Sequence, residues 1–152
     1  MPRAPRVQLA GAIYHVTARG NRGNAIYYDE DDRLLFLGLF DRVVRRHAWR
    51  GLAYCLMTNH FHLVIETCEP DLSRGMHRIN FIYAQHLNDR YSLDGHVFGG
   101  RFGSRLVTNE RQLGRTFRYV AFNPVRAGLC ERPSEWRWSS FYGKDDRLLF
   151  DA

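Results

Sequence analysis

The chain has 152 residues, of which 45% are hydrophobic and 25% charged, a composition typical of one folded domain. This composition excludes a disordered or fibrous chain, and no apolar run approaches the ~18 residues that a membrane-spanning helix needs. The three cysteines form no CxxC pair, which suits reduced thiols and a cytoplasmic protein. We therefore expect a single domain over residues 1–152 that does not associate with membranes.

The charge of the chain indicates an anionic partner. It carries 22 basic against 16 acidic residues, a formal net charge of +6. Lys144 is the only lysine, so arginine provides nearly all of the positive charge. A guanidinium group can bind a phosphate through two parallel hydrogen bonds. A GC-rich genome would give the same arginine bias, but a pI near 9.6 makes nucleic acid the first partner to consider.

The first half of the chain predicts a strand, a helix and a β-hairpin. In residues 12–18, Tyr14 and Val16 alternate with Ile13, His15 and Thr17, as the two faces of a half-buried strand do. After a GNRGN turn at 20–24, acidic residues precede apolar residues at helical spacing, so a helix is expected to about His47. Two β-rich runs around Thr58-Asn59 then predict a hairpin whose second strand covers about 60–66.

The second half predicts a helix, a strand and a further helix. An apolar stripe predicts a helix that begins near residues 71–73. A glycine-rich loop then leads to a short strand at 104–108. Thr108 or Asn109 can cap a third helix, which we expect to end at Pro124 because proline disrupts helices.

This order of elements predicts an α+β fold. Strand, helix, strand, strand, helix, strand is the order of the ferredoxin-like (split βαβ, RRM-like) arrangement, an antiparallel sheet with helices on one face. The last helix is an addition at the C-terminal side. Many unrelated functions use this fold, so the fold alone does not assign one.

The first candidate site is the segment His60-Phe61-His62. On a strand, His60 and His62 share one face while Phe61 points into the core. Two imidazoles on one face, two residues apart, can chelate a divalent metal ion. The alternative is a chance pair of partly exposed strand histidines, and the motif alone does not decide between them.

A tyrosine and an asparagine on the predicted third helix form the second candidate. Tyr119 and Asn123 are four positions apart, which makes them neighbours on one helix face beside the apolar stripe. The amide oxygen can ligate a hard cation, and the phenolic oxygen can act as a nucleophile. The alternative is a surface tyrosine and an asparagine that ends the helix before Pro124.

Tyr83 is a competing candidate nucleophile. It lies in the middle of the apolar stripe of the second predicted helix, and the residue four positions on, Leu87, cannot bind a metal. We therefore interpret Tyr83 as a core residue.

Five segments of the chain resemble the REP-associated branch of the single-tyrosine HUH transposases. The pieces TNHFHLV and YxxxNPVRAG are the most specific of them. The segments cover almost the whole chain in the order that the family has: 12–23, 56–66, 95–102, 119–129 and 136–141.

The resemblance implies a metal-assisted DNA transposase. His60 and His62 would hold Mg²⁺ or Mn²⁺, and Asn123 would complete the metal site. Tyr119 would be the nucleophile that cleaves single-stranded or hairpin DNA of the repetitive extragenic type and forms a 5′-phosphotyrosine with it. The cleaved DNA would then be rejoined from this intermediate. Since a ligating imidazole must be neutral, metal affinity is expected to fall below about pH 6.

Arginines beside these motifs are candidates for DNA phosphate contacts. The predicted DNA-binding arginines are Arg19, Arg22, Arg101, Arg105 and Arg126. Arg115 and Arg118 flank Tyr119 and are candidate helpers in its activation.

Two other functions remain open, a non-catalytic RRM-like nucleic-acid-binding module and a metal-dependent nuclease that uses water. The sequence also leaves open whether the protein is a monomer or a homodimer.

Overall fold

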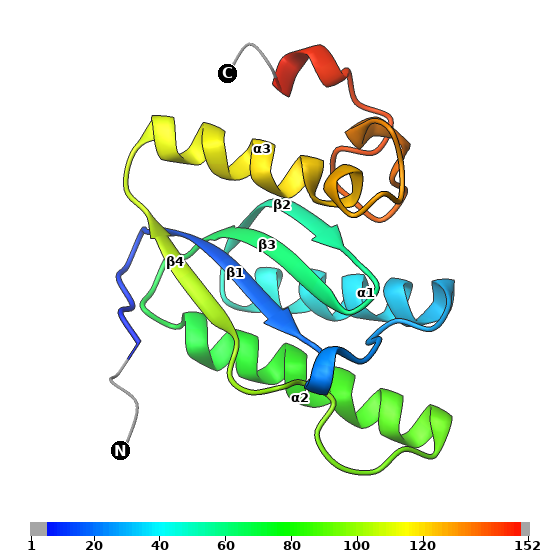
Figure 1. Ribbon diagram of the computed structural model, residues 1–152. Helices are drawn as coiled ribbons and strands as arrows, with labels where there is room; N and C mark the ends of the chain where they lie inside the picture. Colours follow the sequence, from blue (N-terminus) through cyan, green and yellow to red (C-terminus); the bar gives the residue numbers. More distant parts are fainter. Residues whose placement is uncertain (1–5, 150–152) are drawn as a thin grey trace.

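The computed structural model describes residues 6–149, which form a four-stranded sheet and three α-helices (Figure 1). Among these residues no helix has both the length and the apolar character that crossing a bilayer requires. The elements are β1 (Ile13–Arg19), η1 (Asn21–Gly23), α1 (Glu30–Arg46), β2 (Arg50–Leu56), β3 (His60–Glu66), α2 (Leu72–Tyr91), β4 (Gly103–Val107), α3 (Glu110–Arg126), η2 (Pro133–Glu135) and η3 (Asp146–Leu149).

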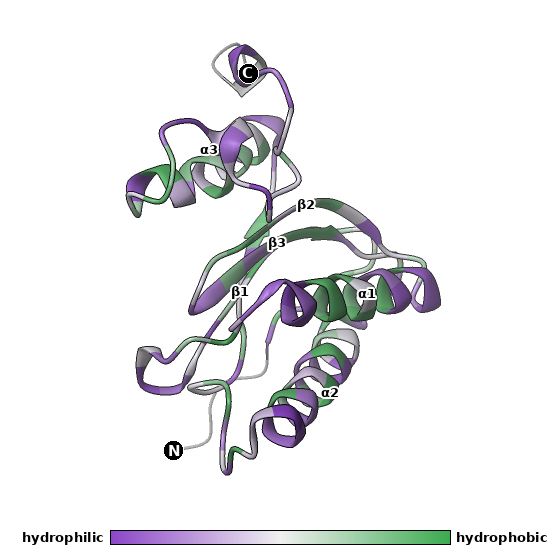
Figure 2. Ribbon diagram, turned by 90° about the vertical axis from the view of Figure 1, so that its right-hand side faces the viewer, coloured by the Kyte–Doolittle hydropathy of each residue, from purple (hydrophilic) through white to green (hydrophobic). Residues whose placement is uncertain are grey.

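The sheet has the strand order β2-β3-β1-β4, and its neighbouring strands are antiparallel. Helix α1 connects β1 to β2, and β3 lies between these two strands, as in the split βαβ arrangement. Figures 1 and 2 show α1 and α2 on one face of the sheet and α3 on the other. The predicted α+β class with an additional C-terminal helix is confirmed.

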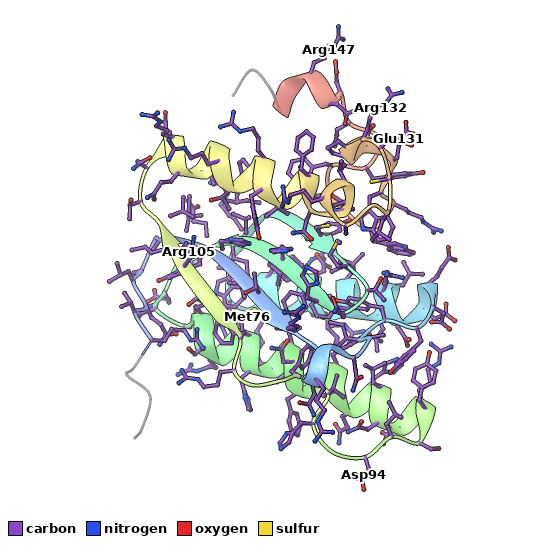
Figure 3. All side chains as sticks on the ribbon, viewed as in Figure 1. Met76, Asp94, Arg105, Glu131, Arg132 and Arg147 are labelled. Atoms are coloured by element: carbon purple, nitrogen blue, oxygen red, sulfur yellow. The ribbon has the colours of Figure 1, made fainter. Side chains whose placement is uncertain are left out.

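The main core lies between the sheet and the helices α1 and α2. Figure 2 shows hydrophilic and hydrophobic residues alternating around these two helices, as expected where only one side of a helix is covered. Met76, labelled in Figure 3, belongs to this core on α2. Phe36, Phe61 and Tyr83 are among the fully buried side chains that fill it.

A second, smaller core lies between the sheet and α3. It contains Cys55 of β2, Val64 of β3 and Val120 of α3, all fully buried. Strand β3 is therefore covered on both faces, with alternate side chains going to the two cores. This small core fixes α3 against the sheet.

The predicted end of α3 at Pro124 is wrong, because the helix continues to Arg126. A proline in the last turn removes only one helical hydrogen bond. The residue that stops the helix is instead Gly128, two positions after its last residue, which adopts a left-handed φ of 75°. Its N–H donates to Val125 O at 3.0 Å, and Leu129 N–H donates to Pro124 O at 2.9 Å. This pair of bonds is a Schellman motif, for which glycine is favoured.

A buried carboxylate, Asp32, joins the beginning of α1 to the end of α2. It accepts hydrogen bonds from the Tyr91 hydroxyl (2.7 Å), Arg90 Nη1 (2.8 Å) and Tyr28 N–H (3.0 Å). Burial alone would raise the pKa of Asp32, but the hydrogen bonds hold it below its usual value. Arg90 also pairs with Asp29, the N-cap residue of α1. The network clamps the two helices together.

Candidate active site

His60 and His62 lie on the face of β3 that is covered by α3. Phe61, between them, is fully buried in the main core, so the predicted alternation is confirmed. His60 Nε2 lies 3.2 Å from Asn123 Oδ1 on α3, and His60 Nδ1 lies 2.8 Å from Asn59 Oδ1. The ring centroids of the two histidines are 5.1 Å apart. Strand β3 and helix α3 thus bring both imidazoles and the amide into one cluster.

Tyr119 lies on α3 one turn before Asn123, and half of its surface is exposed. Its ring centroid is 5.6 Å from that of His62, in an edge-on arrangement. The guanidinium carbon of Arg126 lies 4.4 Å from the centroid of the tyrosine ring, and Arg126 Nη2 donates to Tyr119 O. The phenol is therefore beside the imidazoles, with a cation over its ring and access to solvent.

Tyr83 is far less suited to react. It is fully buried in the main core, and its hydroxyl donates to the carbonyl oxygen of Ile26. Burial raises its pKa further above the ordinary value. The prediction that Tyr83 is a core residue is confirmed.

His15 of β1 joins the cluster, although the sequence motifs did not identify it. Its Nε2 lies 2.9 Å from His62 Nδ1, and the two rings stack with centroids 5.1 Å apart. The ring of His15 is also edge-on to Tyr119 at 5.9 Å. The only sequence signal was the alternation in residues 12–18, which placed His15 opposite the core face of its strand.

Burial favours the neutral form of all three imidazoles. It lowers the pKa of His62 to about 3, and the nearby His15 and His60 act in the same direction. Burial, followed by the charge of Arg105, lowers the pKa of His15 to about 4. Burial also lowers the pKa of His60, against the effect of its hydrogen bond with Asn123. Neutral imidazole is the form that ligates metal ions.

The donor atoms of this cluster fit a divalent cation. Within residues 6–149, the buried His62 Nε2 has no hydrogen-bond partner. The amide of Asn123 is close to His60 Nε2, and Asn123 lines the same cavity as both histidines. The same part of the chain contains no group of three or more His, Cys, Asp or Glu side chains that could hold a metal. A cation here would have two imidazole nitrogens and one amide oxygen, with other positions left for water or substrate oxygens.

Two hollows adjoin Tyr119. The first, which we call the His60 hollow, has a volume of about 420 Å³ and includes His60, Asn123 and two arginines in its lining. The second, the Arg105 hollow, has a volume of about 580 Å³ and lies between β4 and α3. The residues that line both hollows are Thr17, His62, Gly103 and Tyr119.

The structure brings four of the five predicted DNA-binding arginines to this region. Arg19 and Arg101 line the His60 hollow, and Arg105 lines the Arg105 hollow. Arg126 stacks on the ring of Tyr119. Arg22 lies apart on η1 and lines neither hollow.

Comparison with known proteins identifies the family. The sequence matches the family of IS200-like transposases over residues 8–123, a range that includes both motif histidines, Tyr119 and Asn123. The chain belongs to the IS200-like transposases.

Individual relatives of this IS200-like transposase agree with the family. A Haemophilus influenzae protein named as a REP-associated tyrosine transposase is 22% identical over 119 residues, which are 70% of this chain and 67% of the relative. The solved structure of a REP-associated tyrosine transposase bound to a REP hairpin has a TM-score of 0.80 at 19% identity, covering 98% of this chain and 88% of that one. A Deinococcus radiodurans protein solved as a transposase has a TM-score of 0.53 at 12% identity, covering 79% and 94%. The predicted resemblance to REP-associated transposases is confirmed.

The motifs of this IS200-like transposase gave metal and nucleophile roles to residues on β3 and α3, but not the way in which these residues meet β1 and β4. Thr17 lies opposite His62 on one side and opposite Gly103 on the other. These contacts depend on which strands pair and in what register. The local sequence pattern does not contain that information.

Proposed function

We propose that this IS200-like transposase cleaves and rejoins single-stranded or hairpin DNA through a covalent bond between Tyr119 and a 5′ phosphate. The convergence of His60, His62 and Asn123 beside the half-exposed Tyr119 carries the proposal. The similar solved protein is bound to a REP hairpin, which supports hairpins of the repetitive extragenic type as the substrate class.

Tyr119 is proposed as the nucleophile. Its phenolic oxygen bonds to the scissile phosphorus while the bond from phosphorus to the 3′ oxygen breaks. The phenol loses its proton to solvent, and the departing 3′ oxygen takes one up, which leaves a 3′-OH and a 5′-phosphotyrosine. Arg126, over the tyrosine ring, stabilises the negative charge that develops on the phenolic oxygen. Attack by another 3′-OH on the phosphotyrosine reverses the step and rejoins DNA.

We further propose that His60, His62 and Asn123 hold Mg²⁺ or Mn²⁺. The bound cation would act as a Lewis acid on the scissile phosphate. The neutral state of the imidazoles and the unpartnered His62 Nε2 support this role. Asn59 orients the His60 ring through its contact with Nδ1 and leaves Nε2 directed at Asn123.

Two other functions make different demands on these residues. A non-catalytic RRM-like module would bind DNA without needing an imidazole pair beside a Tyr-x-x-x-Asn pair. A water-using nuclease would need the metal ligands but not Tyr119. Formation of a covalent adduct through Tyr119 separates the proposal from both.

The test uses a hairpin oligonucleotide with randomised unpaired flanks and a label at its 3′ end, incubated with the protein and Mg²⁺ or Mn²⁺. A 5′-phosphotyrosine retains the labelled 3′ segment on the protein in a denaturing gel. We expect the adduct from the parent and none from Tyr119→Phe. Tyr83→Phe is the matched control and should form the adduct, because it loses only one buried hydrogen bond, about 1 kcal/mol of stability.

Each alternative has its own outcome. Cleavage without an adduct, in both variants, indicates the water-using nuclease. Hairpin binding with neither cleavage nor adduct indicates the binding module. An adduct that disappears with Tyr83→Phe and persists with Tyr119→Phe contradicts the assignment of the nucleophile.

A further inference from the structure

The Arg105 hollow is lined by cationic and hydroxyl groups from β1, β4 and α3. Arg105 contributes from β4 and Arg115 from α3, and the hydroxyl-bearing residues of the lining are Thr17, Ser104 and Thr116. Figure 3 labels Arg105 on β4, the strand that leads into α3. The hydroxyl of Thr116 already donates to Gln112 O, so the two guanidinium groups are the donors that the hollow presents from two sides.

The two guanidinium groups have no acidic partner. Within the part of the chain that the structure describes, no carboxylate lies at ion-pair distance from Arg105 or Arg115, and none lines the hollow. Other arginines are neutralised, for example Arg50 by a carboxylate on β3 and Arg90 by carboxylates at the start of α1. Two unpaired guanidinium groups at one polar hollow favour an anion with several oxygen acceptors.

The Arg105 hollow adjoins the His60 hollow. Thr17, His62, Gly103 and Tyr119 line both, so groups bound in the two hollows would be neighbours. Gly103 keeps their shared floor open, because a Cβ atom there would lie 3.0 Å from Thr17 Oγ1. Arg115 lies one turn before Tyr119 on α3, which links the second hollow to the position of the phenol.

We propose that the Arg105 hollow binds a phosphodiester group that flanks the one attacked by Tyr119. This inference rests on the proposed function and adds to it a second phosphate subsite with two defined ligands, Arg105 and Arg115. Contacts to phosphate fix the register of a strand without reading its bases. The subsite therefore sets which bond of the strand lies at the phenol, and base recognition is left to other residues.

The experiment replaces the phosphates of a single-stranded hairpin oligonucleotide, one at a time, by uncharged methylphosphonates. Binding is measured with the Tyr119→Phe protein, so that no strand is cleaved. One replacement should weaken binding about tenfold, the effect of one lost charge-assisted hydrogen bond. The same replacement should have a smaller effect once Arg105→Gln or Arg115→Gln is added, because one of the two contacts is already lost, and little effect in the double variant. Arg111→Gln is the control, since Arg111 is an exposed residue of α3 outside the hollow.

The outcomes separate this subsite from the proposed chemistry. A replacement whose effect is reduced in each lining variant, disappears in the double variant and persists with Arg111→Gln supports the subsite. Equal effects of every replacement in all proteins would show that the two arginines contribute only a diffuse field, and would overturn it. The adduct assay with intact Tyr119 is read separately. If the effect of a replacement depends on Arg105 and Arg115 but no adduct forms, the subsite is retained and the phosphotyrosine is rejected. If an adduct forms but the effect of every replacement is independent of the two arginines, only the subsite is rejected.

Discussion

Replacing His15 tests whether the imidazole cluster holds a metal ion. His62 Nε2 can direct a lone pair at a cation only when the ring proton is on Nδ1, which then donates to His15 Nε2 at 2.9 Å. His15→Phe keeps a ring that can stack on His62 but removes the acceptor. His15→Gln removes the ring and can place an amide oxygen near the lost Nε2. The two variants separate the hydrogen bond from the stacking.

The size of the effect follows from the burial of His62. Partners that orient a ligating histidine typically change metal affinity 10- to 100-fold, or about 1.4–2.7 kcal/mol. His62 is only 5% exposed, so water cannot readily replace the lost acceptor. We therefore expect His15→Phe to weaken Mn²⁺ binding by close to 100-fold, and His15→Gln by no more than about 10-fold.

Calorimetric titration with Mn²⁺ measures both affinities, and ¹⁵N NMR of the His62 ring reports which nitrogen carries the proton. In the parent protein with Mn²⁺, the proton should be on Nδ1 of His62. Far-UV circular dichroism confirms that each variant is folded. If His15→Phe binds Mn²⁺ as tightly as the parent, His15 does not orient His62, and the reasoning from the 2.9 Å contact is refuted.

Three predictions concern proton uptake and stability. Because burial lowers the pKa of both proposed imidazole ligands, that of His62 to about 3 and that of His60 below its usual value, Mn²⁺ affinity should begin to fall at a lower pH than the pH 6 that the sequence alone predicts. The same shifts reduce folding stability below about pH 6.5, since the unfolded chain binds protons that the folded chain excludes. Calorimetry and urea unfolding at several pH values check the two predictions. An affinity that falls tenfold per unit below about pH 6.5 would contradict the first, and a stability that stays constant below that pH would contradict the second. Asp32→Ala should lower the free energy of unfolding by about 3 kcal/mol, because Arg90 and Tyr91 lose a buried acceptor, and Asp32→Asn should cost less. A urea-unfolding loss below about 1 kcal/mol for Asp32→Ala would show that water replaces the carboxylate.

Local sequence patterns were sufficient for most of the fold. The hairpin strand at 60–66 was predicted correctly, and the N-cap Asn109 is one of the two caps that the sequence allowed, because alternation and capping are properties of neighbouring residues. The end of α3 was wrong because Pro124 was given more weight than Gly128. A proline in the last turn is tolerated, and the left-handed glycine ends the helix.

The candidate site was predictable only where its residues share a short motif. His60 with His62, and Tyr119 with Asn123, are paired by the period of one strand and of one helix. The convergence of the two pairs came from the family resemblance, since periodicity does not tell which helix covers which strand. His15 shows the same limit, because its contact with His62 spans 47 positions and depends on the register between β1 and β3.

The two faces of the sheet explain why the site is open. The face toward α1 and α2 carries apolar residues on every strand and is closed by the main core. On the other face, α3 packs on β2 and β3 through a small core that includes Val64 and Val120. Ile13 of β1 also packs against the small core, but the part of β1 and β4 at the hollows carries polar side chains, among them His15 and Thr17. These offer little apolar surface for a helix to bury, so nothing drives closure there. The small core holds Tyr119 over the histidines, and the uncovered polar part leaves the space that a DNA strand needs to reach it.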